Sequence, residues 1–320
     1  MQRIPVIDIG SSCDGARTIQ AVEEACRDVG FMYVVNHGIE TEKIAAIRKA
    51  VVEYFRRPLE QKMRHRITRD NYRGYIPLGF FSPATGKDEA DHYEGYKLHH
   101  EVAADDQIRQ ACDLYGPNKW PTEPADMARA VSEYWHACDD VAATLLRVLA
   151  VPLGVEPAWL VQLFDSPLTN MTLLHYPPTA EGGAGFGIHP HKDTDALTIL
   201  AGDEVAGLMV RCRNSNEWID VDPPHNALVV NIGDMMELWS GGYFVSTPHK
   251  VVYVNGAERF SFPYFAVPRY DVVVAPLRDP QPGFVRDSVH VGDVSREVWR
   301  TNWPDAVPQE TGFDLGTLED

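Results

Sequence analysis

The residues with the clearest potential for chemistry are His191 and Asp193, read together with a histidine far downstream, His249. Residues two apart in a β-strand project from the same face, so the imidazole of His191 and the carboxylate of Asp193 point toward a common space. His249 begins another strand-like stretch, His-Lys-Val-Val. Two histidines and one carboxylate on one face of an octahedral iron(II) leave three coordination positions open for a co-substrate and O2. The pattern therefore predicts an iron(II) site.

A candidate anion clamp follows ten residues after the last of these ligands. Arg259 and Ser261 are again two apart in a strand-like stretch. A guanidinium fork and a hydroxyl on one strand face can hold a carboxylate through several hydrogen bonds. A His-x-Asp triplet alone is a weak signal, because 12 histidines and 46 acidic residues produce such triplets by chance. The metal site is favoured over a chance match because the anion clamp follows the three ligands in the sequence.

Two residues near the triplet, His189 and Asp195, could also be considered as metal ligands. His189 shares the strand face of the triplet histidine and is therefore an alternative ligand. Pro190 perturbs the strand between them, so we interpret His189 as a pocket or supporting group. Asp195 does not complete the triplet, and the side chain of Lys192 is expected to point away from the metal.

Strand-like stretches that would position these residues dominate the chain from residue 170 to residue 267. Glycine, proline, asparagine or aspartate separates them, which is typical of two facing sheets in a jelly roll. A glycine-rich connection, residues 180–187, precedes the triplet and is a candidate lid or simply a tolerant loop. The candidate strands are residues 171–176, 187–191, 197–201, 207–211, 218–221, 227–232, 249–254 and 259–267.

The pattern of the N-terminal half predicts helices mixed with short strands. Apolar residues at helical spacing predict helices over residues 18–29, 42–55, 123–149 and 157–164, and strands over 4–9 and 31–35. The longest helix is interpreted as a scaffold that Pro152 and Gly154 end. Residues 63–100 are irregular and aromatic, and their aromatic side chains either line a pocket or pack the helices onto the sheet. His99 and His100 are interpreted as surface residues, and His175 as structural.

Composition limits the partners and the compartment. The chain has 320 residues, with 44% hydrophobic and 23% charged residues, which is ordinary for a globular protein. A net charge of −17 argues against nucleic acid or an anionic membrane as a partner. No apolar stretch approaches the length of a membrane span. Five scattered cysteines without a Cys-x-x-Cys motif favour a reducing, cytoplasmic location.

Six sequence blocks occur in an order that resembles one family. The chain is similar to the isopenicillin N synthase-like branch of the Fe(II)/2-oxoglutarate-dependent dioxygenases. The resemblance implies a fold that is mainly β with flanking helices, built on a double-stranded β-helix core. The matching blocks are an N-terminal signature at 4–8 and 25–39, then 175–178, 191–193 with 197–198, 231–235, 249–252 and 259–261.

The family resemblance also implies an activity. Fe(II) would be held by the triplet and the downstream histidine, with 2-oxoglutarate and O2 as co-substrates. Oxidation of a C–H bond in a small molecule, with hydroxylation as the default outcome, would release succinate and CO2. Arg259, Ser261 and Tyr176 would hold the distal carboxylate of 2-oxoglutarate. The family resemblance also suggests a small substrate that belongs to secondary metabolism or is amino-acid-like.

The family blocks contain one departure from the family pattern and two polar residues with a structural interpretation. The family often has asparagine two residues before the tyrosine, where this chain has Leu174. That departure leaves Tyr176 open between a co-substrate role and a core tyrosine. Asn231 and Asp234 are interpreted as structural turn residues.

The chain is expected to form one compact unit. Residues 1–120 would form a helix and strand region, 121–169 scaffold helices, 170–270 the jelly-roll core and 271–320 a C-terminal tail. Two alternative functions stay open. One is an oxidase or cyclase of the isopenicillin N synthase or aminocyclopropane-carboxylate oxidase kind, which needs no 2-oxoglutarate. The other is a non-catalytic binding protein on the same scaffold. Neither the substrate nor the oligomeric state can be read from the sequence.

Overall fold

Two β-sheets face each other in the computed structural model, which describes residues 3–10, 15–81, 90–179, 185–202, 205–213, 215–253, 256–301 and 303. The larger sheet has the spatial order β1 (Val6–Asp8), β2 (Phe31–Val35), β10 (Leu228–Ile232), β7 (Leu197–Ala201), β13 (Tyr264–Ala266), β5 (Asn170–Tyr176), β4 (Glu94–His99) and β3 (Gly74–Ile76), and β12 (Arg259–Ser261) also pairs with β5. The smaller sheet has the order β6 (Phe186–His191), β11 (His249–Val252), β8 (Leu208–Arg211) and β9 (Trp218–Asp220).

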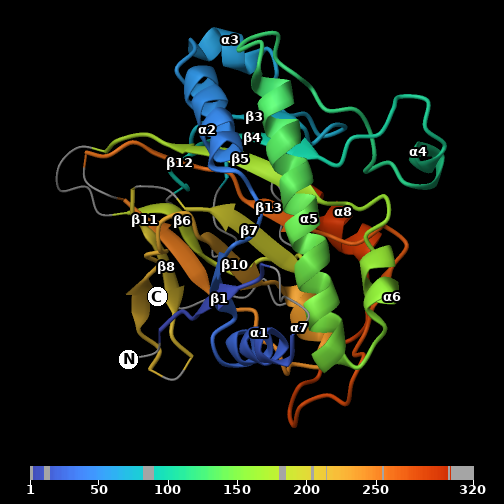
Figure 1. Cartoon of the computed structure of the whole chain (residues 1–320). Coiled ribbons are helices and arrows are strands. Elements are labelled where there is room, and N and C mark those ends of the chain that lie inside the picture. The colour runs from blue at the N-terminus through green and yellow to red at the C-terminus, as the bar shows by residue number, and fades with distance from the viewer. Residues whose placement is uncertain are drawn as a thin grey trace.

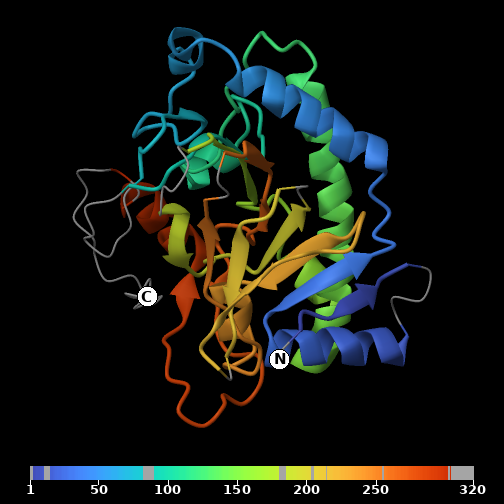
Figure 2. The same cartoon turned by 90° about the vertical axis from the view of Figure 1, so that its left-hand side faces the viewer.

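Helices cover one side of the larger sheet. In Figure 1 the long helix α5 (Met127–Leu153) runs beside the strands, with α2 (Thr41–Phe55) near one end and α1 (Ala16–Asp28) near the other, and Figure 2 shows these three helices on one side of the strands. Helix α5 contacts α1, α2 and α6. The helices are α1 (Ala16–Asp28), α2 (Thr41–Phe55), α3 (Leu59–Met63), α4 (Ile108–Ala111), α5 (Met127–Leu153), α6 (Pro157–Gln162), α7 (Asp234–Trp239) and α8 (Val291–Thr301). Strands β14 (Val273–Val274) and β15 (Val289–His290) pair as a separate two-stranded sheet.

Alternation along the strands creates two apolar layers. On β5, Met171 and Leu173 belong to the core beneath the helices, whereas Leu174 and Tyr176 belong to the core between the two sheets. Successive side chains of a strand point to opposite faces, so one strand serves both layers. The predicted double-stranded β-helix with flanking helices is confirmed, and its metal-facing interior is the space between the sheets.

The long helix and the last predicted strand differ most informatively from their predicted ranges. The long helix begins at Met127 and extends through Pro152 to Leu153, where Gly154 adopts a left-handed conformation (φ 73°) and ends it. Gly154 rather than the proline is therefore the stop signal. The single strand predicted over residues 259–267 is two strands, β12 and β13, interrupted near Pro263, whose nitrogen cannot donate to a ladder.

The segment predicted to be irregular, residues 63–100, contains β3 and β4. Strand β4 lies inside the larger sheet, and its residue His99 is buried and hydrogen-bonded to the carbonyl of Tyr72 (3.0 Å). The prediction that His99 is a surface residue is therefore wrong, because its ring packs against the rings of Tyr72 and Trp299. Most of the predicted loop at residues 180–187 lies outside the described residues. No helix in the described ranges is long and apolar enough to cross a membrane.

Candidate metal centre

Three predicted ligands meet between the two sheets. His191 ends β6 and lies directly opposite His249 at the start of β11, and their ring centres are 4.3 Å apart. Asp193 follows two residues after β6; its carboxylate oxygens lie 3.8 Å from Nε2 of His191 and 3.6 Å from Nε2 of His249. One donor atom from each residue lies within 4.8 Å of the others. Strand pairing thus brings together groups that are far apart in the sequence.

Backbone carbonyls orient both imidazoles. Nδ1–H of His191 donates to the carbonyl of His189 (2.7 Å), and Nδ1–H of His249 donates to the carbonyl of Thr247 (3.1 Å). Because Nδ1 carries the hydrogen, Nε2 of each ring has a lone pair that points toward the shared space and can bind a metal. Burial lowers the pKa of His249 to about 4, although Asp193 opposes the shift. The ring is therefore neutral near pH 7, as a metal ligand must be.

Asp193 is fixed by two neutral side chains. Its Oδ2 accepts hydrogen bonds from the Thr198 hydroxyl (2.5 Å) and the Asn231 amide (2.8 Å). The Thr198 hydroxyl also lies 2.9 Å from Oδ2 of Asp195. Burial raises the pKa of Asp195 well above its ordinary value, and the charge of Asp193 adds to this effect. Asp195 therefore supports the ligand carboxylate instead of replacing it.

The interpretation of Asn231 and Asp234 as turn residues is wrong. Asn231 lies in the fully buried strand β10, and its side chain orients Asp193. Asp234 is the first residue of α7, and its backbone N–H donates to the Asp193 carbonyl (2.8 Å). An asparagine inside the apolar run Leu228–Ile232 is itself a signal, because a buried amide needs a hydrogen-bond partner.

The donor set fits iron(II). Two neutral imidazole nitrogens and one carboxylate oxygen on one side of a shared space match the facial arrangement of non-haem iron sites. His189 is not in this group among the described residues, since its Nδ1 pairs with Asp91 (2.6 Å). The Lys192 ammonium lies 3.5 Å from the Glu237 carboxylate on α7. Both side chains therefore have partners away from the metal.

The candidate clamp residues also converge. In the register of β12 and β5, Arg259 lies opposite Tyr176 and Ser261 lies opposite Leu174. The Arg259 guanidinium lies 5.0 Å from the centre of the Tyr176 ring, and its Nε donates to the Val205 carbonyl (3.3 Å). Its Nη1 is buried without a hydrogen-bond partner among the described residues. A buried cation with a free donor is suited to an anion.

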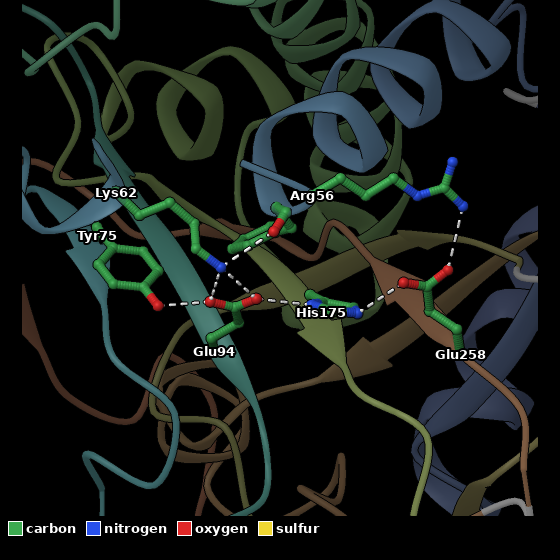
Figure 3. Close-up of polar contacts among 7 residues, drawn as sticks. Arg56, Lys62, Tyr75, Glu94, His175 and Glu258 are labelled. Carbon is green, nitrogen blue, oxygen red and sulfur yellow. Dashed lines mark hydrogen bonds and ion pairs between the residues drawn. The ribbon is translucent and has the colours of Figure 1, made fainter. Parts of the chain in front are cut away.

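Sequence reasoning missed a buried group of charged side chains next to the clamp (Figure 3). Glu94 on β4 accepts hydrogen bonds from the Lys62 ammonium (2.6 Å) and the Tyr75 hydroxyl (2.5 Å). Nδ1 of His175 lies 2.8 Å from the same carboxylate. Burial raises the pKa of Glu94, but the hydrogen bonds from His175, Lys62 and Tyr75 together lower it below its ordinary value of 4.5. Glu94 is therefore a charged centre in the core.

The same group reaches the strand that carries the clamp. Nε2 of His175 lies 3.0 Å from the Glu258 carboxylate, which in turn pairs with Arg56 at 3.4 Å. His175 and Glu258 immediately precede Tyr176 and Arg259 in the sequence. The contact therefore ties β5 to the start of β12 from the helix-covered side (Figure 3). No local sequence pattern indicates it, because its members lie in separate segments of the chain.

Comparisons with known proteins agree with this geometry. Residues 4–123 match the family described as non-haem dioxygenase in morphine synthesis N-terminal, and residues 168–268 match the 2OG-Fe(II) oxygenase superfamily. The chain is 31% identical to 2-oxoglutarate-dependent dioxygenase 11 of Oryza sativa subsp. japonica over 288 residues, which covers 89% of this chain and 76% of that protein.

Two solved structures share the fold. JOX2 in complex with 2OG, Fe and JA is 27% identical with a TM-score of 0.79, and the match covers 96% of this chain and 87% of that one. The dioxygenase for auxin oxidation in rice has a TM-score of 0.72 at 24% identity, covering 92% of this chain and 94% of that one. The second likeness concerns the fold alone.

Proposed function

The chain belongs to the 2OG-Fe(II) oxygenase superfamily, and from this premise we propose that it hydroxylates a C–H bond of a small molecule. It is a 2-oxoglutarate-dependent non-haem iron dioxygenase whose iron is held by His191, Asp193 and His249. Bound iron(II) supplies the site at which O2 and 2-oxoglutarate react, with release of succinate and CO2. What the protein contributes is the arrangement of groups around that site.

Arg259, Ser261 and Tyr176 are proposed to hold the distal carboxylate of 2-oxoglutarate. The observation that supports this is the buried Nη1 of Arg259, which has no partner among the described residues. A carboxylate placed there would satisfy the guanidinium, and the Ser261 hydroxyl on the same strand face adds a further donor. Tyr176 and Val251 line the same small hollow as Arg259, so the charge interaction is strengthened by low polarity.

Hydroxylation is proposed over mere binding because the ligand groups are complete. Each of the two imidazoles and the carboxylate also forms a hydrogen bond that orients it. Such orientation is typical of residues that bind a metal. Absence of iron(II) binding by the purified protein would favour the non-catalytic alternative.

The decisive experiment measures succinate formation across a panel of small molecules, with and without 2-oxoglutarate. We expect basal succinate formation with iron(II), and a stimulation by the true substrate that depends on 2-oxoglutarate and yields a hydroxylated product. A desaturated or cyclised product would correct the reaction type. Substrate oxidation that proceeds equally well without 2-oxoglutarate would contradict the proposal.

A further inference from the structure

A second cation, partly buried, lies on the inner face of the larger sheet. Lys97 on β4 lies opposite Thr172 of β5. Its ammonium donates to Oδ1 of Asn170 (2.6 Å) and to the Thr172 hydroxyl (2.9 Å). Both acceptors are neutral, and no carboxylate of the described residues lies within ion-pair distance. Lysine is rarely buried without a carboxylate, and Lys62, which pairs with Glu94, shows the usual arrangement in this same fold.

The strand register places Lys97 on the metal side of the sheet. Phe265 of β13 lies opposite both Asn170 and Thr198, and the Thr198 hydroxyl donates to the ligand Asp193. Directly opposed residues share a face of a sheet, so this row of side chains faces the metal. The Lys97 ammonium lies 5.2 Å from the centre of the Phe265 ring, at the end of the row.

The inner face of the sheet is not fully enclosed around Lys97. Lys97, Asn170 and Phe265 are each partly exposed, whereas Tyr96 and Leu98, the neighbours of Lys97 that point toward the helices, are 0% exposed. The inner face of the sheet is therefore accessible at this point. A molecule that approaches the metal along this wall meets an ammonium, an amide and an aromatic ring.

The surroundings of Lys97 favour an anion. The protein carries a net charge of −17, yet among the described residues Lys97 and the buried Arg73 donate only to neutral groups, Arg73 to the Leu114 carbonyl (2.8 Å). The nearby Glu101 carboxylate partly opposes the lowering of the Arg73 pKa by burial. Burial lowers the pKa of Lys97 to about 7, while Asp193 and Asp195 oppose the shift. Burial also lowers the pKa of His99, and Arg73 and Lys97 lower it further. A ligand anion would give Lys97 the charged partner that its neutral hydrogen-bond acceptors do not supply.

We propose that Lys97, framed by Asn170 and Thr172, anchors a carboxylate group of the substrate, so that the substrate is a small organic acid. This inference rests on the proposed function. The anchor is separate from the Arg259 clamp, because Asn170 and Tyr176 lie at opposite ends of β5, about 20 Å apart at the usual rise per residue. The row from Asn170 to Thr198 crosses two strand spacings, about 10 Å. A molecule held by its carboxylate at Lys97 therefore presents a carbon several bonds away to the metal.

The test compares acids with their neutral amides. Benzoate, phenylacetate, hexanoate and octanoate, each paired with its primary amide, are titrated calorimetrically into enzyme loaded with iron(II) and 2-oxoglutarate in the absence of O2. The variants are Lys97→Met, which removes the charge at similar length, Lys97→Arg, which keeps it, and Asn170→Asp, which offers Lys97 an internal carboxylate. Lys119→Met is the matched control, because the Lys119 ammonium binds the Arg66 carbonyl in the same region of the protein.

We expect at least one acid to bind the wild type about tenfold or more tightly than its amide, as one charge-assisted hydrogen bond allows. Lys97→Met and Asn170→Asp should abolish this preference, whereas Lys97→Arg and Lys119→Met should keep it. The proposal is wrong if no acid of the panel binds better than its amide, or if Lys97→Met keeps the preference. Basal succinate formation is measured separately in every variant and tests the proposed function. If the wild type forms no succinate, the proposed function is contradicted. If succinate forms but no acid is preferred over its amide, only the role of Lys97 is contradicted.

Discussion

At the level of single residues, the partners of each metal ligand explain why similar neighbours do not replace it. Nδ1 of His191 is engaged by a backbone carbonyl, which leaves Nε2 free, whereas Nδ1 of His189 is engaged by the Asp91 carboxylate. His189 also receives support from Asp91 at its backbone N–H (3.0 Å). These contacts hold the two histidines in different environments although only Pro190 separates them.

Asp193→Ala is expected to remove iron binding and turnover while the fold stays intact, because it deletes the only charged ligand of the three. The measurement is iron content after gel filtration together with succinate formation. His189→Ala serves as the control and should keep its iron, since its side chain pairs with Asp91. Iron loss in the His189 variant, or normal iron content in the Asp193 variant, would show that the ligands are assigned wrongly.

Arg259→Lys is expected to raise the Michaelis constant for 2-oxoglutarate about tenfold or more, because lysine keeps the charge but loses the two-pronged donor. The constant for the substrate should change much less. Initial rates measured with each ligand varied separately check the prediction. If the constant for the substrate rises and that for 2-oxoglutarate does not, the clamp holds the substrate instead.

At the level of elements, the Glu94 group connects β4, β5 and the start of β12 with the helices α2 and α3. The Lys62 and Glu94 side chains are only 8% and 7% exposed, so neither charge is compensated by water. His175, between Glu94 and Glu258, lies one residue from Tyr176, so the group supports the strand pairing that holds the clamp.

Glu94→Gln is expected to lower the free energy of unfolding by about 3–5 kcal/mol, since it leaves Lys62 as an uncompensated buried charge. The folded-state pKa of Glu94 lies below 4.5, so its contribution is present above that pH and is lost as the pH falls through the folded-state pKa. Denaturant unfolding at several pH values should show a smaller acid-induced loss in the variant. Glu60→Gln, which disturbs only an exposed pair with Arg64, should behave like the wild type.

At the level of the whole molecule, the metal ligands come from both partners of one strand pair and the loop after it. Metal binding therefore requires the smaller sheet to be closed onto the larger one, to which Thr198 and Asn231 anchor Asp193. An ion that binds only the folded state stabilises it in proportion to the logarithm of its concentration.

Iron(II) or manganese(II) at about 100 times its dissociation constant should add about 2.7 kcal/mol to the free energy of unfolding. The thermal midpoint of the wild type should rise under anaerobic conditions, and 2-oxoglutarate should raise it further. Asp193→Ala should show no metal-dependent rise. A metal-induced shift of equal size in that variant would mean that the stabilising ion binds elsewhere.

The sequence by itself determined the identity of the metal ligands and most strands around them. His191 and Asp193 are two apart, and their spacing alone predicted that both side chains face one space, although β6 ends at His191 and Asp193 lies in the connection after it. Alternating apolar residues likewise predicted the paired strands, because each strand must cover a core on at least one face. These signals are local, so they can be read from neighbouring residues.

Only the tertiary structure decided which polar side chains support the ligands and which line the interior. Asn231 reaches Asp193 across 38 positions, Lys97 reaches Asn170 across 73, and His175 reaches Glu94 across 81. Such contacts depend on the register between non-adjacent strands, which the spacing of residues along the chain does not specify. The sequence predicts that a buried polar residue has a hydrogen-bond partner, but it does not identify that partner. Strand pairing decides which residue it is.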